Sequence, residues 1–203
     1  MSRYSRNRFI PVLLVIVVII IAVVALVSLA RAIFFSGDRD NNQASQQLDR
    51  NRSALLTTSA DRRVEMTVRG PIVAEENFNS LRIVVSPNSR TLTTYRGYLD
   101  KRIDRIKLGN NVKAYTEFVN ALDKANLALG VPFSEDDDDT NGICATGRIY
   151  EYQLFEGDQS IMRLWTSTCK GSPGSLKASS EQLTDLFIAQ IPDARTPLGN
   201  INF

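Results

Sequence analysis

The sequence predicts an α+β protein, in which an N-terminal transmembrane helix precedes one domain built on an antiparallel sheet. Three observations predict it. Residues 10–30 are almost entirely aliphatic, apolar residues alternate with polar ones from residue 64 onward, and later segments repeat apolar residues at spacings of three and four. We expect about three strands, a helix, a two-stranded hairpin and a C-terminal helix within residues 61–193.

Residues 10–30 are expected to cross a membrane. Only Val, Leu, Ile and Ala occur from Val12 to Val27, and the first charge is Arg31. At about 1.5 Å per residue this run spans about 32 Å, which matches a hydrocarbon core of about 30 Å. A cleaved signal peptide is the alternative. The anchor is preferred because a signal core has only about 7–15 apolar residues.

The short tail 1–9 is basic, with three arginines and no acid, but arginines also follow the apolar run. Basic residues near the membrane are therefore balanced, and they define the orientation weakly. We expect a cytoplasmic tail, a single pass through the cell membrane with lipid contacts along residues 10–30, and an extracytoplasmic domain. The extracytoplasmic placement of the domain relies mainly on its two cysteines, which are described below.

Polar segments flank the predicted domain. Residues 31–60 are expected to form a flexible stalk, because Ser36–Ser53 contains almost nothing that a core could bury. Residues 194–203, beyond the helix-stopping Pro192, are expected to be a loose tail.

The first strands are predicted by alternation and by turn residues. Val64, Met66 and Val68 alternate with polar residues, which is typical of a strand with one buried face. A second strand, residues 81–85, stops at Ser86-Pro87, and a third covers residues 91–95. Residues 97–108 suit a short helix as well as an irregular strand.

Two helices have start and stop signals. Asn110-Asn111 can cap the first, whose apolar stripe runs from Val112 to Leu129 before Gly130 and Pro132 end it. The second begins at the capping box Ser179–Gln182 and continues to Ile191. Both helices are expected to lie on the sheet.

Between the helices, residues 148–155 and 160–168 are expected to pair around the turn Gly157-Asp158. If Glu156 pairs with Gln159, simple counting predicts the pairs Leu154–Ile161, Tyr152–Arg163 and Tyr150–Trp165.

Cys144 and Cys169 are the only cysteines, and this hairpin brings them together near its open end. We predict a disulfide, which favours an oxidising exterior. The segment Trp165–Cys169 superficially resembles the Thr-Leu-x-Thr-Cys segment of sortases. Sortase chemistry needs a histidine beside the cysteine, however, and the chain contains none.

The missing histidine removes Ser-His-Asp and Cys-His catalysis and histidine-ligated zinc. The remaining catalytic candidate is Lys170 close to Ser167 and Ser172, and a turn after the hairpin explains those residues more simply. We therefore expect no enzymatic activity.

The most specific local motif lies in an acidic loop, residues 135–142. From Asp137, with Asp139, Asn141 and Gly142, it reads as the first half of an EF-hand calcium loop. The second half fails, because Arg148 occupies the position of the bidentate glutamate. The preferred interpretation is a solvated loop and no cofactor, with a calcium site at Asp137, Asp139 and Asn141 as the open alternative.

Charge is unevenly distributed. Residues 61–107 hold ten Lys/Arg against six Asp/Glu, whereas residues 108–203 hold seven against thirteen. The basic half could meet an anionic polymer or lipid head groups. The simpler interpretation places its basic residues on the solvent faces of strands. No nucleic acid partner is expected, because the chain has no block of Lys/Arg.

Residues 110–192 resemble a group of uncharacterised, singly anchored envelope proteins of small-genome bacteria. The resemblance implies a surface location and carries no activity. It rests on Asn110-Asn111, Ala114, Tyr115, Phe118, Cys144, Gly147, Arg148, Tyr150, Trp165, Cys169, Leu186-Phe187 and Gln190–Pro192.

These observations predict an extracytoplasmic module for protein interaction or envelope structure, without catalysis, whose partner is an envelope or surface protein. The alternative is a sensor domain that binds a ligand or Ca²⁺ through the acidic loop or the basic strands.

Overall fold

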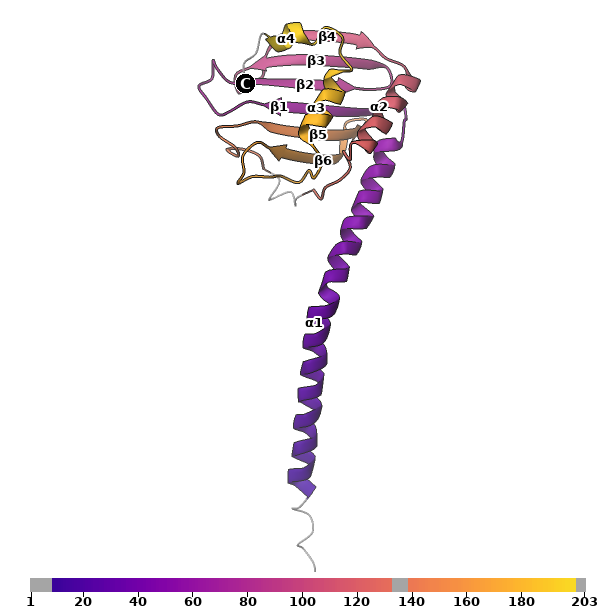
Figure 1. The fold of residues 1–203 in the computed structure, drawn as a ribbon, viewed down its shortest axis with the longest axis vertical. Coiled ribbons are helices and arrows are strands. Elements are labelled where there is room, and N and C mark those ends of the chain that lie inside the picture. Colours follow the sequence, from indigo (N-terminus) through magenta and orange to yellow (C-terminus); the bar gives the residue numbers. More distant parts are fainter. Residues whose placement is uncertain (1–8, 133–138, 200–203) are drawn as a thin grey trace, which may run out of the picture. The chain divides into compact units, whose positions relative to one another are not determined.

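The computed structural model describes the backbone of residues 9–132 and 139–199, and the side chains of residues 13–28, 45–132 and 139–199 (Figure 1). The chain divides into two compact units, Met1–Ser45 and Gln46–Phe203. Each unit is described by itself.

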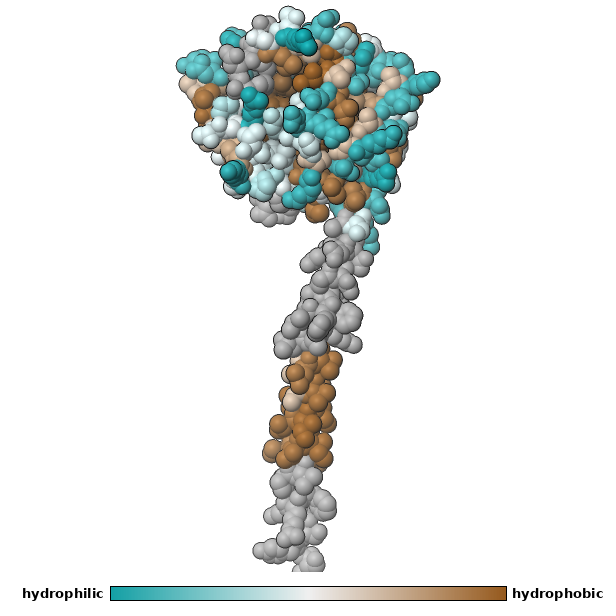
Figure 2. Space-filling model, in the orientation of Figure 1, coloured by the Kyte–Doolittle hydropathy of each residue, from teal (hydrophilic) through white to brown (hydrophobic). Residues whose placement is uncertain are grey.

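Helix α1 runs from Phe9 to Leu56. The side chains described in its first part, residues 13–28, are exposed and nearly all apolar, and Figure 2 colours them as hydrophobic. Within the described part of the chain, no helix is both long enough and apolar enough to cross a membrane. That finding contradicts the predicted transmembrane helix. Lipid contact along residues 10–30 stays a prediction.

The segment predicted as a stalk is helical as far as Leu56, and from Gln46 onward it belongs to the second unit. Leu55 is fully buried there. Arg52 forms an ion pair with Asp123 of helix α2 (Val112–Lys124), with two hydrogen bonds of 2.8 Å. The compact unit therefore begins before residue 61, because a buried leucine and an ion pair hold these turns against it.

The second unit contains one six-stranded antiparallel sheet with the order β4-β3-β2-β1-β5-β6. This sheet is larger than predicted, because residues 101–109 form a further strand and the predicted hairpin joins the first strands. The join is made by β1 and β5, which pair from Arg62↔Glu156 to Arg69↔Ile149. The strands are β1 (Arg62–Arg69), β2 (Asn79–Val85), β3 (Ser89–Arg96), β4 (Lys101–Gly109), β5 (Ile149–Glu156) and β6 (Gln159–Ser167).

The β5–β6 hairpin turns where the sequence predicts it, with Gly157 at φ +57° and Glu156 paired with Gln159. A bulge then shifts the register by one residue, so the three further pairs predicted by counting are wrong. The extra residue, Ile161, places Met162 opposite Leu154 and Leu164 opposite Tyr152. Met162 and Leu164 therefore lie on the core face. Without the bulge they would lie on the opposite face of the sheet.

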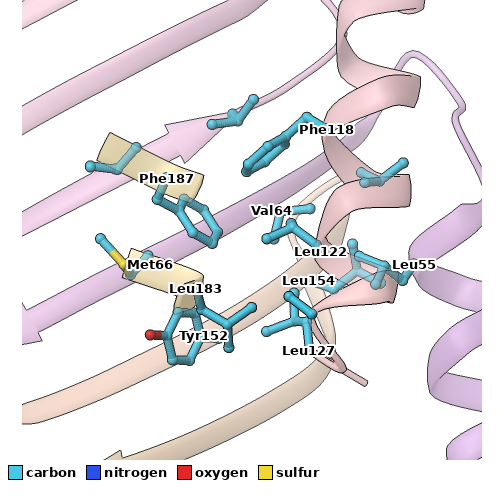
Figure 3. Close-up of a cluster of buried hydrophobic side chains, with 14 of the residues drawn as sticks. Leu55, Val64, Met66, Phe118, Leu122, Leu127, Tyr152, Leu154, Leu183 and Phe187 are labelled. Carbon is cyan, nitrogen blue, oxygen red and sulfur yellow. The ribbon is translucent and has the colours of Figure 1, made fainter. Parts of the chain in front are cut away.

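Helices α2 and α3 (Ser180–Ile188) lie over one face of the sheet (Figure 1). Their predicted caps are present: Asn111 accepts from the Ala114 amide at 2.9 Å, and Ser179 accepts from Gln182 at 3.3 Å. The core fills the layer between helices and sheet (Figure 3). At its centre Phe187 meets the Phe118 ring edge-on at 5.1 Å.

The expected loose tail is partly ordered. Residues 195–199 form the short helix α4 (Arg195–Gly199), in which Pro197 is buried, and Ala194 just before it joins the core. Residues 200–203 lie outside the described residues.

Candidate binding cleft on the open face of the sheet

Strand alternation divides the sheet into a helix-covered face and a second, open face. On β1, Val64, Met66 and Val68 are buried in the core beneath the helices. Residues between them must therefore project from the opposite face. The open face of β1 accordingly carries Arg63, Glu65, Thr67 and Arg69.

A cleft of about 570 Å³ lies on this open face. Five strands and two loops contribute to it, and its lining is dominated by arginine and carboxylate side chains. The lining residues are Arg63, Glu65, Thr67, Arg69, Ser80, Arg82, Tyr95, Asp100, Asp139, Thr140, Asn141, Glu151, Gln153, Phe155 and Arg163.

Glu151 of β5 is the centre of the first charge cluster. It accepts a hydrogen bond from Arg163 of β6 at 2.9 Å, and Arg69 of β1 lies 3.4 Å away. The Gln153 amide donates to its other oxygen. Burial would raise the pKa of Glu151, but the hydrogen bond and charge of Arg163, together with Arg69, outweigh burial and hold the pKa below its ordinary value. Glu151 is therefore a fixed anion at neutral pH.

Glu65 and Arg82 form the second cluster, where Arg82 Nε lies 3.0 Å from a Glu65 oxygen. This pair is close enough for an ion pair but lacks hydrogen-bond geometry at Nε. Burial raises the pKa of Glu65 and prevails over the opposing charges of Arg82 and Arg63. The Glu65 carboxylate is therefore held less firmly than that of Glu151.

Two of the cleft arginines rest on aromatic rings. The Arg63 guanidinium lies 4.1 Å from the centre of the Phe155 ring, and Arg63 donates to the Gly157 carbonyl. The Arg82 guanidinium lies 5.8 Å from the Tyr95 ring centre. Such contacts use the flat face of the guanidinium and leave its in-plane N–H groups for other acceptors.

The acidic loop reaches the cleft at Asp139, Thr140 and Asn141. Arg69 donates to the Thr140 hydroxyl, and the Asn141 amide donates to Asp139 Oδ1 at 2.8 Å. Asp137, the first of the predicted calcium ligands, lies outside the described residues. The part of the chain that the structure describes contains no group of three acidic, cysteine or histidine side chains fit to hold a metal. Calcium binding stays a prediction.

Cys144 and Cys169 are joined by a disulfide, with Sγ atoms 2.13 Å and Cα atoms 5.3 Å apart, so the predicted pairing is confirmed. The cystine packs in a small separate cluster with Ile149 and Trp165. Trp165 is paired with Glu151 in the β5–β6 ladder, so this cluster lies on the open face next to the cleft.

Ser167, Lys170 and Ser172, the residues weighed as a catalytic candidate, lie where β6 ends and the following turn begins. Ser167 Oγ donates to the Ser172 carbonyl at 2.5 Å and accepts from the Cys169 amide at 3.2 Å. These hydrogen bonds tie the Ser167 hydroxyl to the backbone of the turn that follows β6. The absence of enzymatic activity stays a prediction.

No protein-family model matches the chain, and no curated protein matches its sequence. The resemblance of residues 110–192 to envelope proteins stays a prediction.

Replacing Glu151 with glutamine is expected to lower the free energy of unfolding by about 1–2 kcal/mol at neutral pH, because Arg69 and Arg163 lose a charged acceptor. The stabilisation has a defined pH range. The pKa of Glu151 in the folded chain lies below its ordinary value of 4.5, so its contribution is present above about pH 4.5 and is lost as pH falls further.

Denaturant unfolding of the wild type and Glu151→Gln at pH 7 and pH 3 measures this. The difference between the two proteins should shrink at pH 3, since all other titrating groups are shared. A difference that stays constant between the two pH values would contradict the assignment.

Proposed function

We propose that this chain is a non-catalytic binding module that acts outside the cytoplasm and recognises its partner through the cleft on the open face of its sheet. The observation that carries the proposal is the cleft's charge arrangement. Side chains from β1, β2, β5 and β6 hold arginines and glutamates in fixed mutual contact at the centre of an exposed surface. Prearranged charges of this kind favour specificity and fast association.

The extracytoplasmic location is supported by the Cys144–Cys169 disulfide, because such bonds persist mainly in oxidising compartments. A partner in the envelope or at the cell surface follows from that location.

Two features support binding rather than catalysis. The chain has no histidine to move protons at neutral pH. The two glutamates of the cleft are each engaged by arginine, so neither has the arrangement of a general base with an unpaired carboxylate.

A ligand-binding sensor is the second candidate, and the size of the cleft favours it. Its volume of about 570 Å³ lies within the range of about 300–1,000 Å³ typical of small-molecule sites. The two candidates differ in whether the occupant is a macromolecule or a small ligand.

A photoreactive amino acid at Thr67 tests the proposal, because Thr67 lines the cleft. Irradiation of cells that make the full chain should yield one covalent adduct with a partner macromolecule. The same probe at Glu117, exposed on α2, is the matched control and should not yield that adduct.

The adduct formed from Thr67 should fall at least fivefold when Arg82 is replaced by alanine. Equal labelling from positions 67 and 117, or none from position 67, would overturn a macromolecular partner in the cleft. Labelling of a small molecule alone would support the sensor instead.

A further inference from the structure

We infer that the cleft binds an oxyanion group of its ligand, a carboxylate or a phosphate, between Arg63 and Arg82, and that Glu65 occupies this position as an internal counter-ion until the ligand displaces it. The inference rests on the proposed function and specifies the chemistry that the cleft recognises.

Arg63 and Arg82 both lie close to Glu65 in the sheet. Arg63 lies two residues before Glu65 on the same face of β1. Arg82 is paired with Thr67 and reaches diagonally to the Glu65 oxygen at 3.0 Å. The Arg63 guanidinium lies over Phe155 and donates to the Gly157 carbonyl, and its charge still acts on the Glu65 carboxylate together with that of Arg82. Two positive charges therefore act on one carboxylate position, where planar forks of N–H donors suit a carboxylate or a phosphate.

Both arginines are oriented by aromatic rings. Contact with Phe155 and with Tyr95 supports the flat faces of Arg63 and Arg82 and restricts their rotation. An anion that binds in their plane would not have to break these contacts. Less side-chain entropy is lost on binding when donors are held in advance.

Glu65 and Glu151 differ in how firmly they are held. Glu151 is bound by two arginines and an amide, and its side chain is only 13% exposed. Glu65 is almost as buried, at 15% exposed, but it forms its ion pair with Arg82 without hydrogen-bond geometry at Nε, so fewer bonds hold it. Glu65 is consequently the carboxylate that an incoming anion can replace at the smaller cost.

The neighbouring strand β4 also carries positive charge. The ladder places Arg105 of β4 beside Thr93, which in turn pairs with Arg82. Lys107, two residues further along β4, is paired with Thr91, and both β4 side chains are exposed. Positive charge therefore extends from Arg82 to the sheet edge, which favours the approach of an anionic group.

Isothermal titration calorimetry with the full chain tests the inference. A mild non-ionic detergent is included because residues 13–28 expose apolar side chains. The probes are sodium pyrophosphate and sodium citrate, each titrated against a sodium chloride reference of equal ionic strength. We expect saturable binding of at least one probe, and the stronger of the two identifies phosphate or carboxylate as the preferred source.

Arg82→Ala and Arg63→Ala should each weaken binding at least tenfold. Glu65→Gln should strengthen it at least threefold, because the amide leaves the position without a negative charge. Matched controls change the same charges elsewhere: Arg195→Ala on α4 and Glu117→Gln on α2 should stay within twofold of the wild type. Circular dichroism of each variant checks that it is folded.

Binding no stronger than in chloride, equal losses in Arg195→Ala and Arg82→Ala, or a Glu65→Gln variant that binds no tighter would each overturn the inference. This failure is distinguishable from failure of the proposed function. A partner that crosslinks from position 67 and stays bound in excess pyrophosphate and citrate leaves the proposed function in place and rejects the oxyanion site.

Discussion

Replacing Cys144 and Cys169 together with serine is expected to lower the free energy of unfolding by about 3–4 kcal/mol. The bond joins residues 25 positions apart, and opening a loop of that size returns conformational freedom to the unfolded chain. For a domain of this size the loss corresponds to a fall in melting temperature of about 10 °C. Differential scanning calorimetry and urea unfolding of the two proteins measure it.

The loss should also have a local component. The cystine packs with Ile149 and Trp165, and the loop before β5 is tied to residue 72 through a 2.8 Å hydrogen bond from the Ile72 amide to the Ala145 carbonyl. Amide hydrogen exchange in residues 139–148 should therefore accelerate more in the double serine variant than exchange in α2. This loop includes the cleft residues Asp139, Thr140 and Asn141.

Reduction provides the control for this prediction. Dithiothreitol should destabilise the wild type by a similar amount and leave the double serine variant unchanged. Two free thiols in the native protein by mass spectrometry, or a loss below about 1 kcal/mol, would contradict the assigned role of the bond. Two free thiols would also remove the main support for an extracytoplasmic location.

Leu55→Ala is expected to cost about 3 kcal/mol of unfolding free energy. Leu55 is fully buried in the core at the end of α1, so truncation removes apolar contacts and leaves a cavity. The result matters because residues 46–56 read as a polar stalk in the sequence. A large loss would show that these turns are part of the folded unit.

The neighbouring leucine is a matched control. Leu56 has the same side chain and lies one residue further, but it is 36% exposed. Leu56→Ala should therefore cost less than about 1 kcal/mol by the same urea unfolding measurement. Equal and small losses for both variants would mean that residues 46–56 behave as a linker.

The features of this fold that could be predicted are those encoded within one segment of chain. The caps at Asn111 and Ser179 depend on side chains three residues from their amide donors. The turn at Gly157 and the pairing of Glu156 with Gln159 depend on four consecutive residues. The disulfide followed from the hairpin, since two cysteines at similar distances from one turn must lie close together.

The structural predictions were wrong where contacts between residues distant in the chain decide the local structure. The stalk contains few apolar residues, but Leu55 is buried because the core offers it a site. The bulge at Ile161 carries no turn signal. It is favoured because it directs Met162 and Leu164 to the core with Leu154 and Tyr152. No residue of the fourth strand is fully buried, and Ile103 is exposed whereas Ile106 and Leu108 are half-buried, so its apolar residues do not keep a period of two.

The cleft was predictable only in part. Alternation along β1 already places Arg63, Glu65, Thr67 and Arg69 on one face, and the basic excess of residues 61–107 suggested solvent-facing arginines. The acidic loop was recognised as a separate candidate. Neither the alternation along β1 nor the acidic motif indicated that β1 and the acidic loop would meet. They do so where Arg69 contacts Thr140.

Capping, periodicity and turn geometry act over a few residues, so the sequence alone predicted the caps of α2 and α3, the turn between β5 and β6, the two faces of β1 and the cystine. The pairing of β5 with β1, across 80 or more residues of the chain, emerges only in the tertiary structure. This pairing joins the first strands to the hairpin and brings Glu151 to Arg69, which assembles the cleft. The physical reason is that strand pairing joins generic backbone groups, so its choice of partner depends on the burial of the whole core and leaves no local signature.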